Sequence, residues 1–324
     1  IFKQFLSELW DFFVCFVVKN FKKMEVLIIN FQEITKADKE LFDSFFKNHY
    51  YENSHFNFTN YFMWRKSYQI KYAKLADVLF FKAKYADEEF LLQPIGPKKR
   101  AQAAIGKCLQ YCEEANIPFK MVGVEGWMAE ELLKYDKTKF DFLPDRDNFD
   151  YVYLQEDLAQ LKGRRYHSKK NHVNNFKKSY SDYEYKELTP DLVEQCKANL
   201  NNWFEQNDGF NDDIIMAERE AIFEVLDNFT ALKLTGGTIL INGKVEAFTF
   251  GEQLNTDTAV IHVEKANPEI RGAYAIINQE FCQKAWSHLK YINREEDMGI
   301  EGLRQAKKSY KPVKMIGKYI VTVK

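Results

Sequence analysis

The chain has 324 residues, about twice the length of a typical domain, so we expect two domains or one large one. Apolar residues make up 46% of the sequence and aromatic residues 16%, which excludes an intrinsically disordered protein. The formal net charge of -1 gives no overall attraction toward nucleic acids or membranes, so only a local patch of charge would bind either.

The cysteines predict a reducing compartment. They are odd in number and scattered, in a chain long enough to fold without disulfides: Cys15, Cys108, Cys112, Cys196 and Cys282. Cys108 and Cys112 are four residues apart on a predicted helix, but no histidine or second cysteine pair follows at a spacing that binds metal. We therefore expect packed thiols, no metal site and a cytoplasmic protein.

The first 23 residues contain an uninterrupted apolar run only over residues 12–18, bounded by Asp11 and Lys19. Seven residues cannot span a bilayer, and neither a basic leader nor a cleavage site typical of a signal peptide is present. Because Met24 precedes a strand pattern at 26–31, we interpret residues 1–23 as an extension that does not belong to the natural protein. The alternative is an amphipathic helix that binds a membrane surface or a partner.

The first half of the chain shows a regular order of predicted elements. Thr35 stands three residues before Asp38 and opens a helix, whose apolar residues Leu41, Phe42, Phe45 and Phe46 follow the helical period. The full set is a strand at 26–31, this helix, a short helix at 60–65, strands at 68–74, 78–85 and 90–95, a helix at 98–115, a strand at 119–124 and a helix at 127–135.

The second half repeats three strands followed by a long helix. Its predicted elements are a strand at 151–154, helices at 164–178, 192–206 and 214–226, strands at 183–188, 231–241, 245–252 and 258–264, a helix at 272–288, a strand at 291–293, a helix at 302–308 and a closing strand at 314–323. Asn242 and Gly243 join two of these strands as a hairpin. The repeated order predicts a tandem duplication, with domains at 24–148 and 149–324.

This order of elements resembles the GNAT acyltransferase fold, so we expect an α+β protein of two tandem GNAT-like domains. Each domain would be a mixed, largely antiparallel sheet flanked by helices. The resemblance implies that the long helix after the third strand of each meander receives a pyrophosphate at its N-terminus. The corresponding segments are 94–99 in the first half and 269–274 in the second.

The strongest local pattern is the segment 162–178. It carries seven lysines or arginines and two histidines but no acidic residue, whereas residues 182–227 carry 13 acidic and three basic residues. Arg164, Arg165, Lys169 and Lys170 are therefore candidates for binding the phosphates of an RNA, a lipid headgroup or a coenzyme. The alternative is a solvated helix face that pairs with the acidic helices after it.

A second pattern lies at 293–312, which reads Asn-Arg-Glu-Glu-Asp-Met-Gly-Ile-Glu-Gly-Leu-Arg-Gln-Ala-Lys-Lys-Ser-Tyr-Lys-Pro. Together with Lys-Gly-Arg-Arg-Tyr-His-Ser-Lys-Lys-Asn at 162–171 and Gly-Ala-Tyr-Ala-Ile-Ile-Asn at 272–278, it resembles the phosphatidylglycerol lysyltransferase C-terminal family. That family and the related Fem enzymes have tandem GNAT domains and move an aminoacyl group from charged tRNA to a lipid or peptidoglycan acceptor. The resemblance implies a bacterial aminoacyl- or acyltransferase.

The resemblance also supplies candidate catalytic residues, because Asp297, Arg304 and Lys307 fall on motif positions. Transfer from an ester requires a cation near the developing oxyanion and a group that accepts a proton from the nucleophile. Lys307 or Arg304 would serve the first role, and Asp297 or Glu296 the second. The alternative is that Asp297 caps the last helix and forms an ion pair with Arg304. Arg271 and Gly272 are added to the candidate donor site because they precede the long helix of the second half.

The chain also departs from these relatives, since it has neither the membrane-spanning portion of the lipid lysyltransferases nor the coiled-coil arm of the Fem enzymes. The loop around Arg271 also places Tyr274 and Ile276 where a coenzyme A binder would have small residues. Our first hypothesis is aminoacyl transfer from charged tRNA to a small or peptidic acceptor. The alternatives are an acyl-CoA-dependent N-acyltransferase and a non-catalytic module that binds an anionic ligand. No cofactor is expected beyond the donor substrate, and the sequence does not define an oligomeric state.

Overall fold

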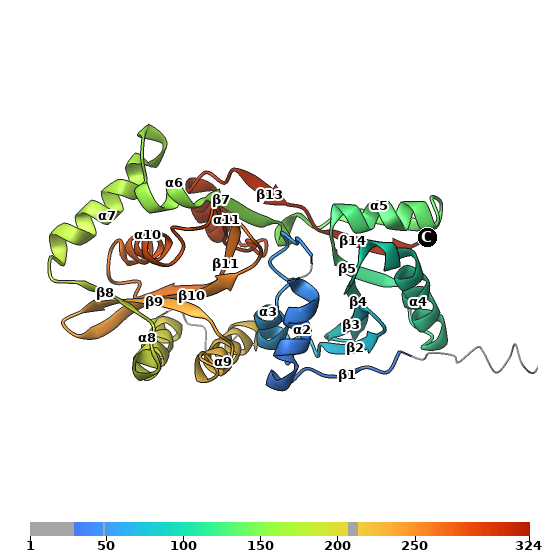
Figure 1. Cartoon of the computed structure of the whole chain (residues 1–324). Coiled ribbons are helices and arrows are strands. Elements are labelled where there is room, and N and C mark those ends of the chain that lie inside the picture. Colours follow the sequence, from blue (N-terminus) through green and yellow to red (C-terminus); the bar gives the residue numbers. More distant parts are fainter. Residues whose placement is uncertain (1–28, 48, 207–212) are drawn as a thin grey trace, which may run out of the picture.

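The computed structural model describes residues 29–47, 49–206 and 213–324, which form two sheets of seven strands, each flanked by helices (Figure 1). The fold is the expected tandem GNAT-like arrangement of mixed, largely antiparallel sheets. Most of the predicted segment at 26–31 lies outside the described residues. No helix within the described ranges is long and apolar enough to cross a membrane.

The first half begins with a capped helix, as the sequence predicted. The backbone N–H of Thr35 donates to Asp38 Oδ2 at 2.7 Å, which closes a capping box before α2. Its elements are β1 (Gln32–Glu33), α2 (Lys39–Phe46), α3 (Phe58–Trp64), β2 (Lys71–Leu75), β3 (Val78–Tyr85), β4 (Glu88–Ile95), α4 (Ala101–Glu114), β5 (Lys120–Val124), α5 (Gly126–Tyr135) and β6 (Phe140–Pro144).

The second half contains the remaining elements. These are β7 (Asp150–Leu154), α6 (Gln155–Gln160), α7 (His167–Ser179), β8 (Glu184–Glu187), α8 (Val193–Gln206), α9 (Asp213–Asp227), β9 (Thr235–Ile241), β10 (Lys244–Gln253), β11 (Thr258–Ala266), α10 (Ala273–Ala285), β12 (Tyr291–Asn293), α11 (Glu301–Ser309), β13 (Lys314–Ile316) and β14 (Tyr319–Val323). The predicted hairpin at Asn242 and Gly243 is confirmed, because both residues have positive φ and Ile241 pairs with Lys244.

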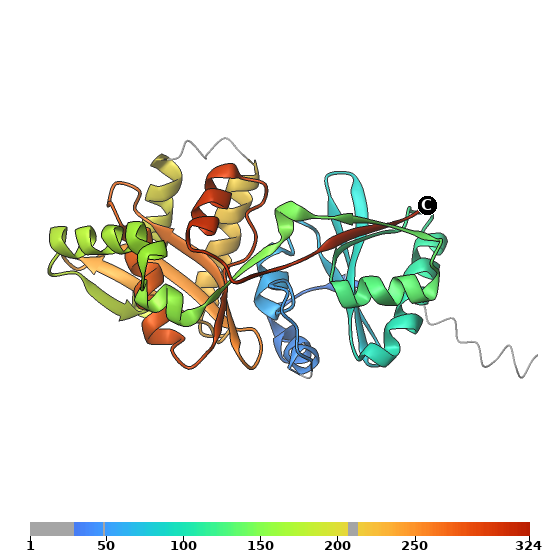
Figure 2. The ribbon, with the colours of Figure 1, turned by 90° about the horizontal axis from the view of Figure 1, so that it is seen from above.

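One strand of the second half lies in the sheet of the first. The first sheet has the order β1-β2-β3-β4-β5-β14-β6, so the last strand of the chain is inserted into the sheet of the first half. The second has the order β13-β7-β12-β11-β10-β9-β8, and all of its strands come from the second half. Figure 2 shows the segments at β7 and β14 running between the halves in opposite directions. The expectation of one closing strand at 314–323 was therefore wrong, because the chain passes from one sheet to the other between Ile316 and Tyr319.

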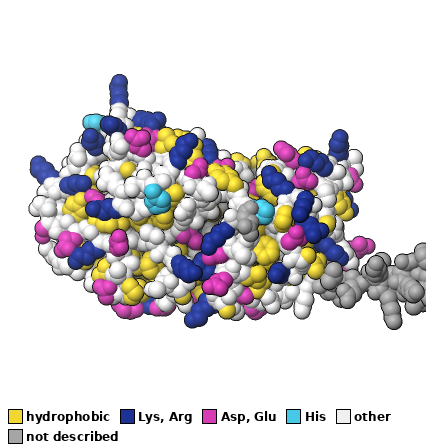
Figure 3. Space-filling model, viewed as in Figure 1, with side chains coloured by type: hydrophobic (Ala, Val, Ile, Leu, Met, Phe, Trp, Pro, Cys, Tyr) yellow, Lys and Arg dark blue, Asp and Glu magenta, His cyan; other side chains and the backbone are white. Residues whose placement is uncertain are grey.

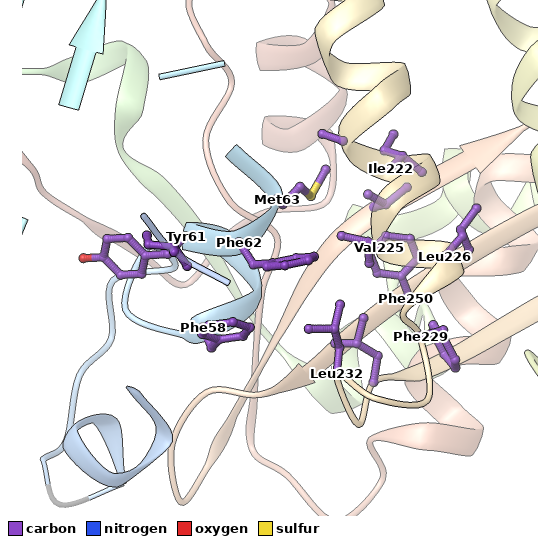
Figure 4. Packing of buried hydrophobic residues seen from close by; sticks show 14 of the residues in the cluster. Phe58, Tyr61, Phe62, Met63, Ile222, Val225, Leu226, Phe229, Leu232 and Phe250 are labelled. Atoms are coloured by element: carbon purple, nitrogen blue, oxygen red, sulfur yellow. The ribbon is translucent and has the colours of Figure 1, made fainter. Parts of the chain in front are cut away.

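The halves also share a hydrophobic core. One cluster of buried side chains joins α2, α3 and the first meander to α8, α9 and β10 of the second half. In Figure 4, Phe62 and Met63 of α3 face Ile222, Val225 and Leu226 of α9. Burial of one such side chain contributes roughly 1.5–3 kcal/mol. This packing and the insertion of β14 into the first sheet hold the two halves together.

Candidate active site

The site is built around the point where two parallel strands of the first sheet separate. Strands β4 and β5 pair only at Leu91–Met121 and Leu92–Val122. A cavity of about 180 Å³ opens there, and the loop between β12 and α11 contributes Glu296 and Met298 to its lining. Its lining residues are His55, Asn60, Tyr61, Trp64, Tyr68, Ile70, Ala83, Phe90, Leu92, Val122, Gly123, Asp145, Asn148, Glu296, Met298 and Lys318.

Buried charges form one end of this cavity. The ammonium of Lys318, fully buried, lies 2.7 Å from Asp150 Oδ1 and 3.2 Å from Glu296 Oε2. It also lies 3.0 Å from His55 Nε2. The same Nε2 atom lies 3.6 Å from Glu296 Oε2. The cavity therefore has a polar end where an ammonium, a carboxylate and an imidazole meet.

The electrostatics fix the charge states of this end. Burial alone would raise the pKa of Glu296, but Lys318 and His55 outweigh it and hold that pKa well below its ordinary value. Burial would likewise lower the pKa of Lys318, but Asp150 and Glu296 raise it. Both groups are charged at neutral pH. A second carboxylate, Asp145, lines the cavity and accepts a hydrogen bond from the Asn148 side chain at 2.8 Å.

The loop that presents Glu296 has an unusual backbone. Glu295 and Met298 both have φ in the left-handed region, 56° and 53°, and Gly299 has φ 74°. Such conformations cost about 1–3 kcal/mol each in residues other than glycine, and they persist only where the surroundings impose them. Strain of this kind is common at functional sites, where it directs side chains, and here it places Glu296 and Met298 at the cavity.

Asp297 and Arg304, two of the predicted catalytic residues, hold this loop from behind. Asp297 is fully buried and accepts two hydrogen bonds from Arg304, at 2.8 and 3.0 Å, one from the Tyr151 hydroxyl at 2.5 Å and one from the Gly299 backbone. Although burial opposes ionisation, Arg304 and Tyr151 keep the pKa of Asp297 far below its ordinary value. The Asp297–Arg304 ion pair, which was the alternative to a catalytic role, is therefore present.

Lys307, the third predicted catalytic residue, lies on the other side of the same loop. Its ammonium donates to the backbone carbonyl groups of Arg294 and Glu295. Burial is the main reason that its pKa falls to about 8. Asp297, Arg304 and Lys307 thus meet around one loop, but none of them lines the cavity. The geometry gives them a positioning function, and a direct catalytic role stays a prediction.

The corresponding strand separation in the second half is filled by charged side chains. Strands β11 and β12 pair only from Thr258–Tyr291 to Val260–Asn293. Beyond this point His262, almost fully buried, lies 3.1 Å from Glu252 and 2.9 Å from Glu295. Burial opposes protonation of His262, but the two carboxylates raise its pKa to about 9. Asn60 of the first half donates to the same Glu295 at 3.2 Å, so this cluster reaches the cavity.

The predicted donor-site residues divide into two groups. Lys169 lies 4.3 Å from the centre of the Tyr310 ring, and burial together with Arg294 lowers its pKa. The pKa of the His172 imidazole is lowered by burial and, to a smaller extent, by the positive charges of Lys169 and Arg271. Gly272 follows at the start of α10, with φ 90°. The structure therefore gathers Lys169, Arg271 and Gly272 around His172.

The other three residues point elsewhere. Arg165 forms a two-pronged ion pair with Asp157 at 2.7 and 2.8 Å. Arg164 and Lys170 are exposed and have no ion-pair partner among the described residues. Lysine and arginine side chains project at the end of the molecule where α7 lies (Figure 3). Binding of a donor's phosphates by Arg164, Arg165, Lys169, Lys170, Arg271 and Gly272 stays a prediction.

Several cavity residues were missed at the level of sequence. His55, Asn60 and Lys318 belong to no recognisable motif, although the segment 53–60 is unusually rich in asparagine for a run that also contains two phenylalanines. Lys318 stands alone between two short strands, and its burial depends on three elements distant in sequence. Glu296 was named only as an alternative to Asp297.

The tandem GNAT-like fold places the chain among proteins of the GNAT-type architecture. A sequence model of the family described as phosphatidylglycerol lysyltransferase, C-terminal, matches residues 48–322. The chain belongs to this family. The resemblance drawn from residues 162–171, 272–278 and 293–312 is therefore confirmed.

Three individual proteins show what this chain is similar to. A conserved protein of unknown function from Bacteroides thetaiotaomicron has 39% sequence identity and a TM-score of 0.86, and the match covers 91% of this chain and 100% of that one. L-PGS from Bacillus licheniformis shares the fold at 14% identity and a TM-score of 0.62, over 88% of this chain and 91% of its own. An uncharacterised protein of Mycoplasmoides gallisepticum is 25% identical over 196 residues, which are 59% of this chain and 62% of that protein.

Proposed function

We propose that the chain transfers an aminoacyl group from charged tRNA to an amine of a small or peptidic acceptor. The observation that carries the proposal is the cavity at the strand separation, where His55, Glu296 and Lys318 meet at one end. An aminoacyl ester carries an ammonium next to its reactive carbonyl. Glu296 and Asp145 offer carboxylates for the ammonium, and His55 offers an N–H for the carbonyl oxygen.

The reaction needs little beyond positioning. The acceptor amine forms a C–N bond with the ester carbonyl carbon, the C–O bond to the tRNA ribose breaks, and the amine proton ends on the ribose oxygen. The positive charge of Lys318, which lies behind His55, stabilises the oxyanion that develops on the ester carbonyl oxygen during the transfer. The buried side chains around these groups keep water from competing with the acceptor.

Packing at both helix N-termini supports an aminoacyl donor over an acyl-CoA donor. A Cβ atom on Gly272 would lie 2.7 Å from the carbonyl oxygen of His172, so the start of α10 packs directly against α7. In the first half, a Cβ atom on Gly96 would lie 2.7 Å from the carbonyl oxygen of Asp77. Each glycine therefore serves close packing of the protein on itself.

We assign the tRNA contact to the exposed side of α7 and the reaction to the cytoplasm. Arg164 and Lys170 present free charge to solvent. Cys108, Cys112, Cys196 and Cys282 are free thiols, which supports the assignment to a reducing compartment. The double variant Arg164→Glu/Lys170→Glu should weaken tRNA retention on filters and lower the slope of log affinity against log salt by about two. The control, Lys36→Glu/Lys137→Glu, changes the net charge equally, far from α7, and should leave both unchanged.

Transfer itself is tested with Glu296→Gln. We expect the rate of aminoacyl transfer at low substrate concentration to fall roughly 100-fold, because the ammonium loses its charged partner. Glu301→Gln, five residues along the chain on an exposed position, should retain the parental rate. Binding of charged tRNA without any turnover by the parental chain would favour a non-catalytic module. Thermal stabilisation by acetyl-CoA alone would replace the proposal with a coenzyme A enzyme.

A further inference from the structure

The residues that line the cavity are of two kinds. Asp145, Glu296, Lys318 and His55 supply its carboxylates, its ammonium and its imidazole. Eight of the other twelve are aromatic or aliphatic side chains from α3, the strands β3, β4 and β5 and the segment between α3 and β2: Tyr61, Trp64, Tyr68, Ile70, Ala83, Phe90, Leu92 and Val122. The other four are Asn60, Gly123, Asn148 and Met298. A ligand whose polar group lies at Glu296 therefore extends its body into an apolar chamber.

From this division we infer that the cavity selects an aminoacyl group with an uncharged, apolar side chain, aromatic or branched, and disfavours lysyl. The inference rests on the proposed function, since it names the substrate class for the same site. With the α-ammonium at Glu296 and Asp145, a lysine side chain would carry its second ammonium to the wall formed by Ile70, Leu92 and Val122. No lining residue of that wall offers a carboxylate. An unpaired ammonium in such surroundings loses its hydration without compensation.

The size of the chamber supports the same class. A cavity of about 150 Å³ lined by apolar side chains is known to hold one benzene ring. At about 180 Å³, this cavity accommodates one aromatic or branched side chain but not a long lipid tail. Trp64 and Phe90 add aromatic surface, which favours a ring through offset or edge contacts.

Aminoacyl amides test the inference, because they reproduce the aminoacyl group without the tRNA. Isothermal titration of the whole chain with phenylalaninamide, leucinamide and lysinamide should give affinities at least tenfold higher for the first two than for lysinamide. Alaninamide has the same ammonium but only a methyl side chain, which does not fill the chamber. Its affinity should be lower than that of phenylalaninamide or leucinamide, or too low to measure. Lysinamide binding as tight as phenylalaninamide would overturn the inference.

Two variants place the discrimination in the chamber itself. Ala83→Leu fills the space beside Phe90 and should weaken phenylalaninamide at least tenfold, whereas Ala103→Leu, on the exposed side of α4, should not. Leu92→Glu adds a carboxylate to the apolar wall at a half-buried position and should raise the affinity for lysinamide relative to phenylalaninamide. Melting temperatures will show whether both variants fold. If both fold and neither changes the ratio of the two affinities, the chamber does not discriminate between aminoacyl side chains and the inference is wrong.

Transfer assays separate this inference from the proposed function. Turnover with charged tRNA that favours lysyl over phenylalanyl and leucyl groups would overturn the inference and leave aminoacyl transfer in place. Turnover in the absence of any amide binding would likewise overturn it, because the cavity would then not hold the aminoacyl group. No turnover with any charged tRNA would overturn the proposed function, and the inference with it.

Discussion

The two halves of the molecule use one feature of the fold in opposite ways. In each sheet a parallel pair of strands separates after a few residues, β4 from β5 and β11 from β12. The first separation opens as a cavity, whereas the second is filled by His262, Glu252 and Glu295. The fold alone therefore does not decide where a ligand binds, since the side chains at the separation do.

The segment that follows β12, next to the filled separation of the second sheet, also contributes residues to the cavity in the first sheet. The loop after β12 leaves the charged cluster of the second half and delivers Glu296 and Met298 to the cavity of the first. Lys318 lies between β13 and β14, in the segment that crosses from one sheet to the other. The second half thus contributes Glu296, Met298 and Lys318 to a cavity whose other lining residues belong to the first. The three predictions below test this division, beginning with the largest expected effect.

Removal of the cation that links the halves should be the most damaging change. Lys318→Met leaves the buried carboxylates of Asp150 and Glu296 without their shared partner, which typically costs about 3–5 kcal/mol. Urea denaturation followed by circular dichroism should show a loss of this size in the free energy of unfolding. In the double variant Lys318→Met/Asp150→Asn, removal of one orphaned charge should restore part of it.

Lys314→Met provides the matched control. Lys314 is four residues away and pairs with Glu52, but about a third of each side chain is exposed, so the change should cost less than about 1 kcal/mol. If both variants lost the same free energy of unfolding, Lys318 would contribute no more than an exposed ion pair does. The contribution of the second half to the cavity would then not depend on Lys318.

The pH dependence of stability tests the filled separation directly. The pKa of His262 is raised from 6.5 in the unfolded chain to about 9 in the folded one, so the folded state binds the proton more tightly. The resulting stabilisation is fully present below pH 6.5 and is lost as the pH rises through 9, by up to about 3 kcal/mol. Urea denaturation of the parental chain and of His262→Gln between pH 6 and 9.5 measures this, and the gap between them should shrink as the pH rises.

Lys307 makes the variant comparison necessary. Its pKa is lowered to about 8, so its own contribution to stability increases above that pH and opposes the loss from His262. The difference between the two chains removes this term, since both contain Lys307. A gap that stays constant across the range would show that His262 is neutral when folded and that the cluster is not held by charge.

Sequence patterns foretold the fold better than the site, and particular residues explain why. The capping box at Thr35, the hairpin at Asn242 and the meanders depend on neighbours in the chain, so local periodicity and turn chemistry reveal them. The insertion of β14 into the first sheet was not foreseen, because an isolated apolar strand carries no information about which of two similar sheets it joins.

The candidate site shows the same limit. Motif positions led to Asp297, Arg304 and Lys307, which surround the strained loop, but the groups at the cavity come from four separate parts of the chain. His55, Asp145, Glu296 and Lys318 line one cavity only in the folded chain, in which β14 of the second half lies in the sheet of the first. Spacing along the sequence cannot report a distance that tertiary structure creates.

The smallest predicted effect is a difference in the free energy of unfolding between alanine variants at Gly163 and at Gly272, the residue that precedes α10. It tests whether the second half has room for a ligand. Gly163 and Gly272 both have φ near 90°, so alanine at either position costs about 1–2 kcal/mol from the backbone alone. A Cβ atom on Gly163 meets nothing within 4 Å, whereas one on Gly272 would lie 2.7 Å from the backbone of α7. Urea denaturation should therefore show a loss for Gly272→Ala that exceeds that for Gly163→Ala by roughly 1 kcal/mol or more. Equal losses would mean that α7 moves away readily, leaving the N-terminus of α10 and the nearby Arg271 open to a phosphate. The second half would then hold a ligand of its own, and the contrast between an open and a filled separation would no longer stand.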